Sequence, residues 1–253
     1  MHLPEIDKYA NLNSVFHSWD ARVKIISFSF LIICLALLPN LSSSFLGFIL
    51  AIILVILSKI PFVFVLRQLR WVILFILFFF VIMPLTVPGE EMARLNFVAI
   101  SRQGLRLSSL IALRAISICM VVLVMIGTMK FHKTLKALEK LKLPNKLIQM
   151  VMFTYRYIFV LLGELGRMST AARARLFKKK TDIHTLKITG NLIGMLFIRG
   201  FERTQAVYNA MASRGYKGKL KIQDEFRLSK IDLLKAFLII TVAVTLTIVG
   251  WFL

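Results

Sequence analysis

Residues 107–129, LSSLIALRAISICMVVLVMIGTM, form an apolar run long enough to cross a lipid bilayer as one helix. A hydrocarbon core about 30 Å thick needs roughly 20 residues of α-helix. The run is continuously apolar, whereas the strands of a membrane β-barrel alternate between apolar and polar positions. This segment therefore predicts an all-α integral membrane protein.

Similar runs occupy residues 25–38, 45–57, 71–87 and 233–253, so we predict about five transmembrane helices. The first two are short for a complete crossing and represent either two thin spans or one kinked hairpin. Residues 147–162 are also apolar but contain Arg156, and we predict that they are partly embedded. A chain that is 58% hydrophobic, with a mean hydropathy of +0.79, is unsuited to a soluble globular fold.

The formal net charge is +21, and the basic residues are concentrated in one segment. Of the 33 lysines and arginines, 22 lie in residues 130–230. Because cytoplasmic segments of membrane proteins are enriched in these residues, we expect the N-terminus and this segment to be cytoplasmic. The predicted organisation is transmembrane helices in residues 1–129, a cytoplasmic or partly embedded region in 130–230, and a last transmembrane helix in 231–253.

The basic segment is predicted to hold helices over about residues 132–141, 147–180 and 186–214, of which the last two are long and amphipathic. On their polar faces arginines lie beside alanines, unlike the lysine and glutamate mixture of an ordinary solvated helix. These residues are Arg167, Ala171, Ala174 and Arg175, followed by Arg199, Arg203, Ala206, Ala210 and Arg214. Since arginine binds carboxylates bidentately and alanine permits close approach, we predict docking into an acidic groove of a partner protein.

Two other partners of a basic segment need to be weighed. Anionic lipid head groups attract any polybasic segment at a membrane surface, and this alternative stays open. Nucleic-acid binding requires aromatic side chains among the cations, but here the aromatics lie on the apolar helix face, so we predict no nucleic-acid partner. Gly215 has the position of a left-handed helix cap, which would fix Arg214 at an exposed helix end.

Arg114 lies inside the apolar run of residues 107–129, where a cation is costly unless it is paired or reaches water. We favour a structural bond to helix-end carbonyls or to an acid such as Glu164, with a role in the substrate path as the alternative. The four histidines are scattered, so we predict no metal site, and we predict no cofactor. An enzyme would need converging acids or histidines in its spans, and residues 25–57 contain none.

Several blocks together resemble the transmembrane T component of energy-coupling factor (ECF) transporters, in particular the CbiQ-like cobalt and nickel type. The blocks are NSVFHSWDARVK at 13–24, GLRLSSLIALRAISI at 104–118, LKALEKLKLPNKL at 135–147 and TYRYIFVLLGEL at 154–165. The family carries an Ala-Arg-Gly motif on each of two cytoplasmic coupling helices. Ala174-Arg175-Leu176 matches the first motif except for its glycine, and Ser213-Arg214-Gly215 matches the second except for its alanine.

The resemblance implies a non-catalytic scaffold of an ATP-driven uptake system in a prokaryotic plasma membrane. The chain has no phosphate-binding loop of its own. The resemblance implies that two ATP-binding-cassette (ABC) ATPase subunits receive Arg175 and Arg214, and that a separate S component in the membrane binds the substrate. Cobalt is the favoured substrate, with nickel, or a T component shared among vitamin transporters, as the alternatives.

Overall fold

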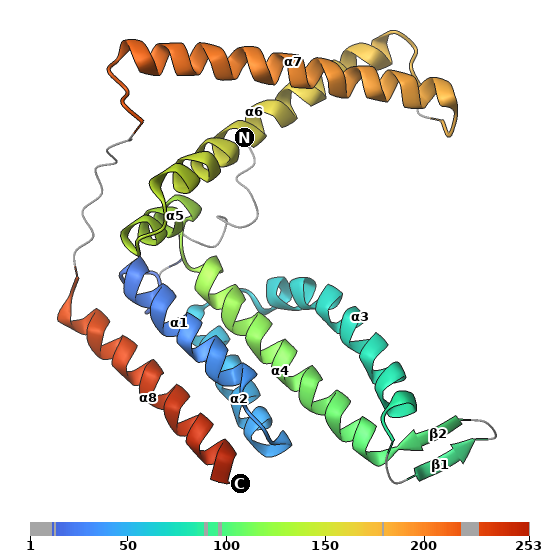
Figure 1. Ribbon diagram of the computed structural model, residues 1–253, viewed down its shortest axis with the longest axis vertical. Helices are drawn as coiled ribbons and strands as arrows, with labels where there is room; N and C mark the ends of the chain where they lie inside the picture. The colour runs from blue at the N-terminus through green and yellow to red at the C-terminus, as the bar shows by residue number, and fades with distance from the viewer. Residues whose placement is uncertain are drawn as a thin grey trace. The chain divides into compact units, whose positions relative to one another are not determined.

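The computed structural model describes residues 12, 14–88, 91–95, 98–178, 180–218 and 228–252. Figure 1 shows the elements in chain order. They are α1 (Ala21–Ala36), α2 (Leu41–Ser58), α3 (Phe62–Thr86), β1 (Glu91–Leu95), β2 (Val98–Ser101), α4 (Arg102–Gly127), α5 (Phe131–Lys140), α6 (Asn145–Ala174), α7 (Ile183–Ser213) and α8 (Lys230–Phe252). The predicted helical class is confirmed, with one addition, because β1 and β2 pair as a short antiparallel hairpin between α3 and α4.

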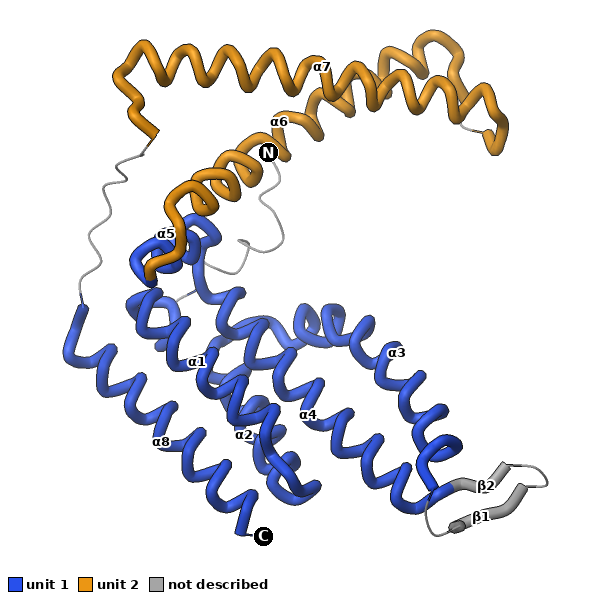
Figure 2. Tube along the Cα trace, in the orientation of Figure 1, with its two compact units in different colours: residues 1–141, 225–253 blue, residues 142–224 orange. Residues whose placement is uncertain are grey.

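The chain divides into two compact units, residues 1–141 with 225–253, and residues 142–224 (Figure 2). The first unit holds α1 to α5 together with α8, and the second holds α6 and α7. Helices from the two ends of the chain share the first unit because α8 packs against α1 and α2.

The core of the first unit forms around α4, which packs against α1, α2 and α3. Phe28, Leu31 and Leu35 of α1 recur at spacings of three and four and are buried, as are Val121 and Val124 of α4. The outer surfaces of these helices are apolar too, and α3 is mostly exposed along its length. A helix that is apolar on all sides and largely uncovered is suited to contact with lipid.

Among the described residues, five helices are long and apolar enough to cross a membrane, namely α2, α3, α4, α6 and α8. The protein is therefore a multi-pass membrane protein. The number agrees with the prediction, but the membership differs. The predicted span at 25–38 corresponds to α1, which has 16 residues and is cut short ahead of Pro39, since proline disfavours helix in the residue before it. The segment predicted to be partly embedded belongs to α6, a helix of 30 residues.

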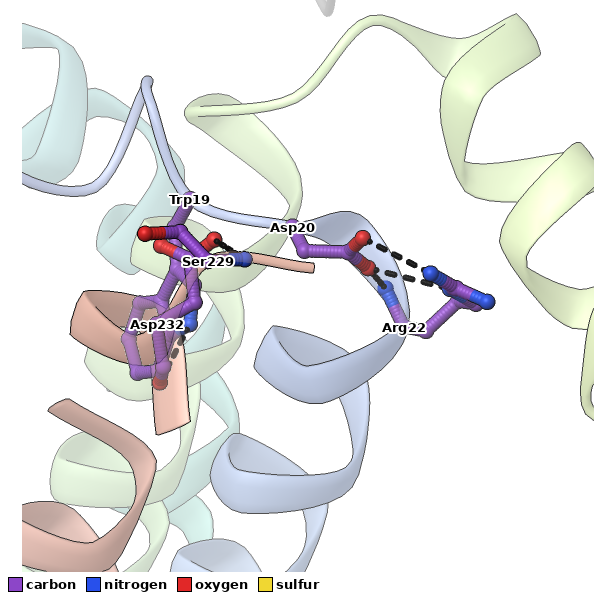
Figure 3. Close-up of polar contacts among 5 residues, drawn as sticks. All are labelled: Trp19, Asp20, Arg22, Ser229 and Asp232. Atoms are coloured by element: carbon purple, nitrogen blue, oxygen red, sulfur yellow. Dashed lines mark hydrogen bonds and ion pairs between the residues drawn. The ribbon is translucent and has the colours of Figure 1, made fainter. Parts of the chain in front are cut away.

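Polar contacts fix the start of α1 and the start of α8 (Figure 3). Asp20 caps α1 by accepting a hydrogen bond from the Arg22 N–H at 2.9 Å, and its carboxylate pairs with the Arg22 guanidinium at 3.0 Å. The Asp232 carboxylate accepts a bond from the Ser229 N–H at 3.4 Å. Trp19 Nε1–H donates to the backbone oxygen of Asp232 at 3.1 Å, which ties the segment before α1 to the beginning of α8.

Lys24 is fully buried near the start of α1. Its Nζ donates to the backbone oxygen of Phe16 at 3.1 Å and to Thr128 Oγ1. Thr128 in turn donates to the Val124 carbonyl at 2.6 Å. Both partners of the ammonium are neutral oxygens, and sequence patterns gave no sign that this lysine would be buried.

Candidate functional site

The first motif, Ala174-Arg175-Leu176, forms the end of α6. Leu176 has a φ angle of 64°, in the left-handed region, and its N–H donates to the Arg173 carbonyl at 3.0 Å. The Phe177 N–H donates to the Ala172 carbonyl at 3.1 Å. These two bonds make a Schellman motif, with Leu176 in the position that glycine usually takes. The expected extension of this helix to residue 180 is wrong, because the left-handed turn ends it at Ala174.

The second motif, Ser213-Arg214-Gly215, ends α7 with the same turn. Gly215 has a φ angle of 81°, and its N–H donates to the Ala212 carbonyl at 3.0 Å. The Tyr216 N–H donates to the Met211 carbonyl, also at 3.0 Å. The left-handed Gly215 predicted from the sequence is confirmed. Each motif arginine therefore occupies the same place, the residue before the left-handed position of a Schellman turn.

Arg175 and Arg214 are both exposed, as are the other four residues of the two motifs. Within the described ranges, neither guanidinium has a hydrogen bond or an ion pair. A cation at the C-terminal end of a helix is favoured by the helix dipole. Both side chains are thus available to carboxylates of another molecule.

The two arginines lie at opposite ends of α7. Arg175 lines a cavity of about 650 Å³ together with Asp182 and Thr185, which lie at the start of α7. Arg214 follows the last residue of the same helix, which has 31 residues. At 1.5 Å per residue, this helix is about 46 Å long. One acidic groove of ordinary size cannot hold both.

The end of α7 is tied back to the start of α6. The Tyr216 hydroxyl bonds to Gln149 Oε1 at 2.5 Å. Gln149 Nε2 donates to the Gly218 carbonyl at 3.3 Å and to Asn145 Oδ1 at 2.6 Å. Gln149 is buried. Sequence reasoning missed this contact, since nothing in the spacing of residues relates Gln149 to Tyr216.

Three of the arginines predicted to support the coupling helices make contacts within α6 or between α6 and α7. The Glu164 carboxylate of α6 pairs with Arg167 of the same helix and with Arg199 of α7. The Arg203 guanidinium lies over the Tyr157 ring, 5.9 Å from its centroid. Arg199 and Arg203 therefore contribute to the contact between the two helices, as well as to the basic surface.

The predicted supporting alanines and Arg114 have different surroundings. Ala171 lines the cavity beside Arg175, whereas Ala206 and Ala210 are exposed on α7. The Nε of Arg114 is buried and has no hydrogen-bond partner among the described residues. A bond between Arg114 and Glu164 stays a prediction.

The apolar stripe of α7 is uncovered. Phe197, Phe201 and Tyr208 are 76%, 65% and 61% exposed, and no residue of α7 is buried. Aromatic side chains of this size need lipid or a partner protein to leave water. Over the described part of the chain, no three histidine, cysteine or acidic residues come together as a metal site.

A family model described as cobalt transport protein, CbiQ, matches residues 12–224. The chain belongs to the CbiQ family. An uncharacterized protein of Methanocaldococcus jannaschii is 30% identical over 96% of this chain and 85% of its own length. The energy-coupling factor transporter transmembrane protein EcfT of Bacillus subtilis is 29% identical over 84% of each chain. The cobalt transport protein CbiQ of Rhodobacter capsulatus is 32% identical over 88 residues, about a third of each chain.

The resemblance inferred from the sequence blocks is confirmed by these matches, and the chain is a CbiQ-like T component of an ECF transporter. The region matched by the CbiQ model includes both Schellman ends and stops before α8. The T component is a transporter subunit, and we therefore consider the exposed arginines and apolar stripes in terms of transport.

Proposed function

We propose that this CbiQ-family protein is the membrane scaffold through which two ABC ATPase subunits drive an S component that takes up cobalt. The description of the family model as a cobalt transport protein supports the choice of metal. Nickel remains the first alternative substrate. The likeness to EcfT proteins favours a second, a T component shared among vitamin transporters.

The observation that carries this proposal is the pair of matching helix ends. Arg175 and Arg214 are exposed, lack partners within the described residues and occupy the same place in matching turns, at opposite ends of a helix about 46 Å long. With that separation, each arginine enters the groove of a different ATPase subunit. Closure of the ATPase pair on ATP then moves the ends of α6 and α7, and these rigid helices carry the motion into the membrane.

The exposed apolar stripe of α7 is where the S component binds in this proposal. Phe197 and Phe201 lie on one face at a spacing of four and are both mostly exposed. Such a face slides along another apolar helix without breaking directional bonds, which suits a moving interface. Anionic lipids contact the basic surface around it.

The proposed orientation places the N-terminus and both helix ends in the cytoplasm, where ATP is available. A cysteine placed at exposed Lys217 tests this directly, in a background that carries Cys34→Ala and Cys119→Ala. A membrane-impermeant maleimide should label it in inverted vesicles but not in intact cells. Labelling in intact cells would reverse the topology.

The coupling role is tested by co-purification. With the parent chain, two ABC ATPases should be recovered in the same complex, and Arg175→Ala combined with Arg214→Ala should release them. The matched control combines Arg173→Ala with Lys217→Ala, which removes two exposed cations next to the motifs. An intact complex from the double motif variant, or equal loss from the control, would refute docking by these two arginines.

The substrate is tested separately by uptake of radioactive cobalt into cells that express all subunits. Unlabelled nickel and cobalt are used as competitors. Cobalt should compete at lower concentration than nickel. Uptake of neither ion, together with vitamin uptake, would favour the shared T component.

A further inference from the structure

A basic cavity of about 770 Å³ lies in the first unit, whereas the two motif arginines belong to the second. The segment before α1, the end of α2 and the start of α5 surround it. Lys59, Lys130 and Lys133 line it, together with Ser14 and Ser18. No aspartate or glutamate is among the lining residues that the structure describes. The cavity therefore presents positive charge without a counter-charge among its described lining residues.

The three cavity lysines have no other partner among the described residues. Within the described ranges, the ammonium groups of Lys59, Lys130 and Lys133 make no hydrogen bond or ion pair, and Lys59 and Lys133 are exposed. Three like charges around one cavity repel one another, and an anion between them removes that repulsion. The cavity is suited to bind an anion.

A fourth basic group, the buried amine of Lys24, lies behind the residues that line the cavity. The buried Lys24 ammonium donates to the Phe16 carbonyl, and the residues on either side of Phe16, Val15 and His17, line the cavity. Its other acceptor, Thr128, is neutral, and Lys24 has no ion pair with any described carboxylate. Burial lowers the pKa of Lys24 to about 7, and an anion in the adjacent cavity would favour its charged form.

The remaining lining residues are apolar and lie at the end of a membrane-spanning helix. Ile56 and Leu57 belong to the last turn of α2 and are 68% and 48% exposed. An inorganic anion gains nothing from such side chains, whereas an acyl chain does. We propose that this cavity binds an anionic phospholipid, with its phosphate among Lys59, Lys130 and Lys133 and its first acyl carbons against Ile56 and Leu57.

The proposal is tested with the full chain purified in detergent and titrated with phosphatidylglycerol, while native mass spectrometry counts the bound lipids. One cation near a lipid head group contributes roughly fivefold in affinity. The variant Lys59→Gln, Lys130→Gln, Lys133→Gln should therefore bind the first phosphatidylglycerol about a hundredfold more weakly than the parent. Phosphatidylcholine, whose head group carries no net charge, should bind weakly to both.

The control is Lys140→Gln, Lys142→Gln, Lys146→Gln, which removes the same charge at exposed positions outside the cavity lining. It should bind phosphatidylglycerol within about twofold of the parent. Equal weakening in the two triple variants would overturn the proposal, since it would show general attraction to a basic surface. Displacement of the lipid by inorganic phosphate at equal concentration would also overturn it, because the site would then bind free phosphate.

Thermal melting of both triple variants checks that they are folded. If the cavity variant melts early, the single change Lys59→Gln replaces it, since Lys59 is exposed and lies beyond the last residue of α2. A fivefold loss of phosphatidylglycerol affinity supports the site, and no loss contradicts it. Failure of this test leaves docking of the ATPases unaffected, because the lysines and the motif arginines are in different units.

Discussion

Leu176 holds a left-handed backbone conformation that glycine adopts without steric cost, and it is 86% exposed. A non-glycine residue in this region costs about 1–2 kcal/mol, and the exposed side chain returns little of it by packing. Leu176→Gly should therefore raise the free energy of unfolding by about 1 kcal/mol, measured by denaturant unfolding in detergent. The same substitution at Leu165, inside α6, should lower it. Equal destabilisation by both changes would show that Leu176 is unstrained.

A second prediction concerns the acceptors of the buried Lys24 ammonium. Thr128→Val removes one of its two neutral acceptors and keeps the shape of the side chain. Burial lowers the pKa of Lys24 to about 7, so the charged form predominates at about pH 6, where a hydrogen bond to a charged group contributes about 1.5–3 kcal/mol. The free energy of unfolding at that pH should fall by this amount. Thr128→Ser keeps the hydroxyl and should restore most of the stability. A valine variant as stable as the serine variant would mean that the bond contributes nothing.

These residues differ in how far the sequence predicts them. Gly215 and Arg214 could be placed because a helix end is a local feature, in which glycine after a polar residue stops an amphipathic pattern. Leu176 stands where glycine usually follows a helix, and the sequence did not show that a leucine would adopt the left-handed conformation there. Lys24 was missed for a different reason, because its partner Thr128 is 104 residues away along the chain.

At the scale of elements, the contact between the end of α3 and the start of α4 depends on Gly104. A Cβ built there would lie 2.6 Å from the Met83 carbonyl oxygen and 2.7 Å from the Pro84 Cα, both backbone atoms. Gly104→Ala should force the two helices apart and lower the free energy of unfolding by about 1–3 kcal/mol. Gly163→Ala is the matched control, since nothing lies within 4 Å of the added atom. It should stabilise α6 by about 0.5–1 kcal/mol, and loss of stability there would contradict this account.

The elements were predicted best where an apolar pattern has clear ends. The helices expected at 132–141 and 186–214 correspond to α5 and α7 with ends shifted by a few residues. The hairpin of β1 and β2 was missed, because two short strands in a connection carry little pattern. The sequence also predicted a span at α1 and only a partly embedded segment at α6, whereas α6 and not α1 is long enough to cross a membrane. Apolar length alone does not show where Pro39 and the Asp20 cap will limit a helix.

For the whole molecule, charge distribution predicted the basic region but not its division between two units. The sequence boundaries at residues 130 and 231 follow composition, whereas the observed boundaries at 142 and 224 follow packing. Packing places α5 with α1, where Ala137 and Ile25 are buried together. Lys130 and Lys133 of the cavity thus belong to a different unit from the motif arginines, although all four come from one continuous basic segment.

The last prediction follows from the separation of the two motif arginines and rests on the proposed ATPase docking. Removing an arginine from a partly desolvated acidic groove costs about 2–5 kcal/mol of binding free energy. Because Arg175 and Arg214 lie at opposite ends of α7, which is about 46 Å long, the losses from Arg175→Ala and Arg214→Ala should add in the double variant. The measurement is ATPase affinity for the chain in lipid nanodiscs, determined for the parent, both single variants and the double variant. A double loss within about 0.5 kcal/mol of the sum places the arginines in independent grooves, whereas a much smaller double loss would mean that both act on one site.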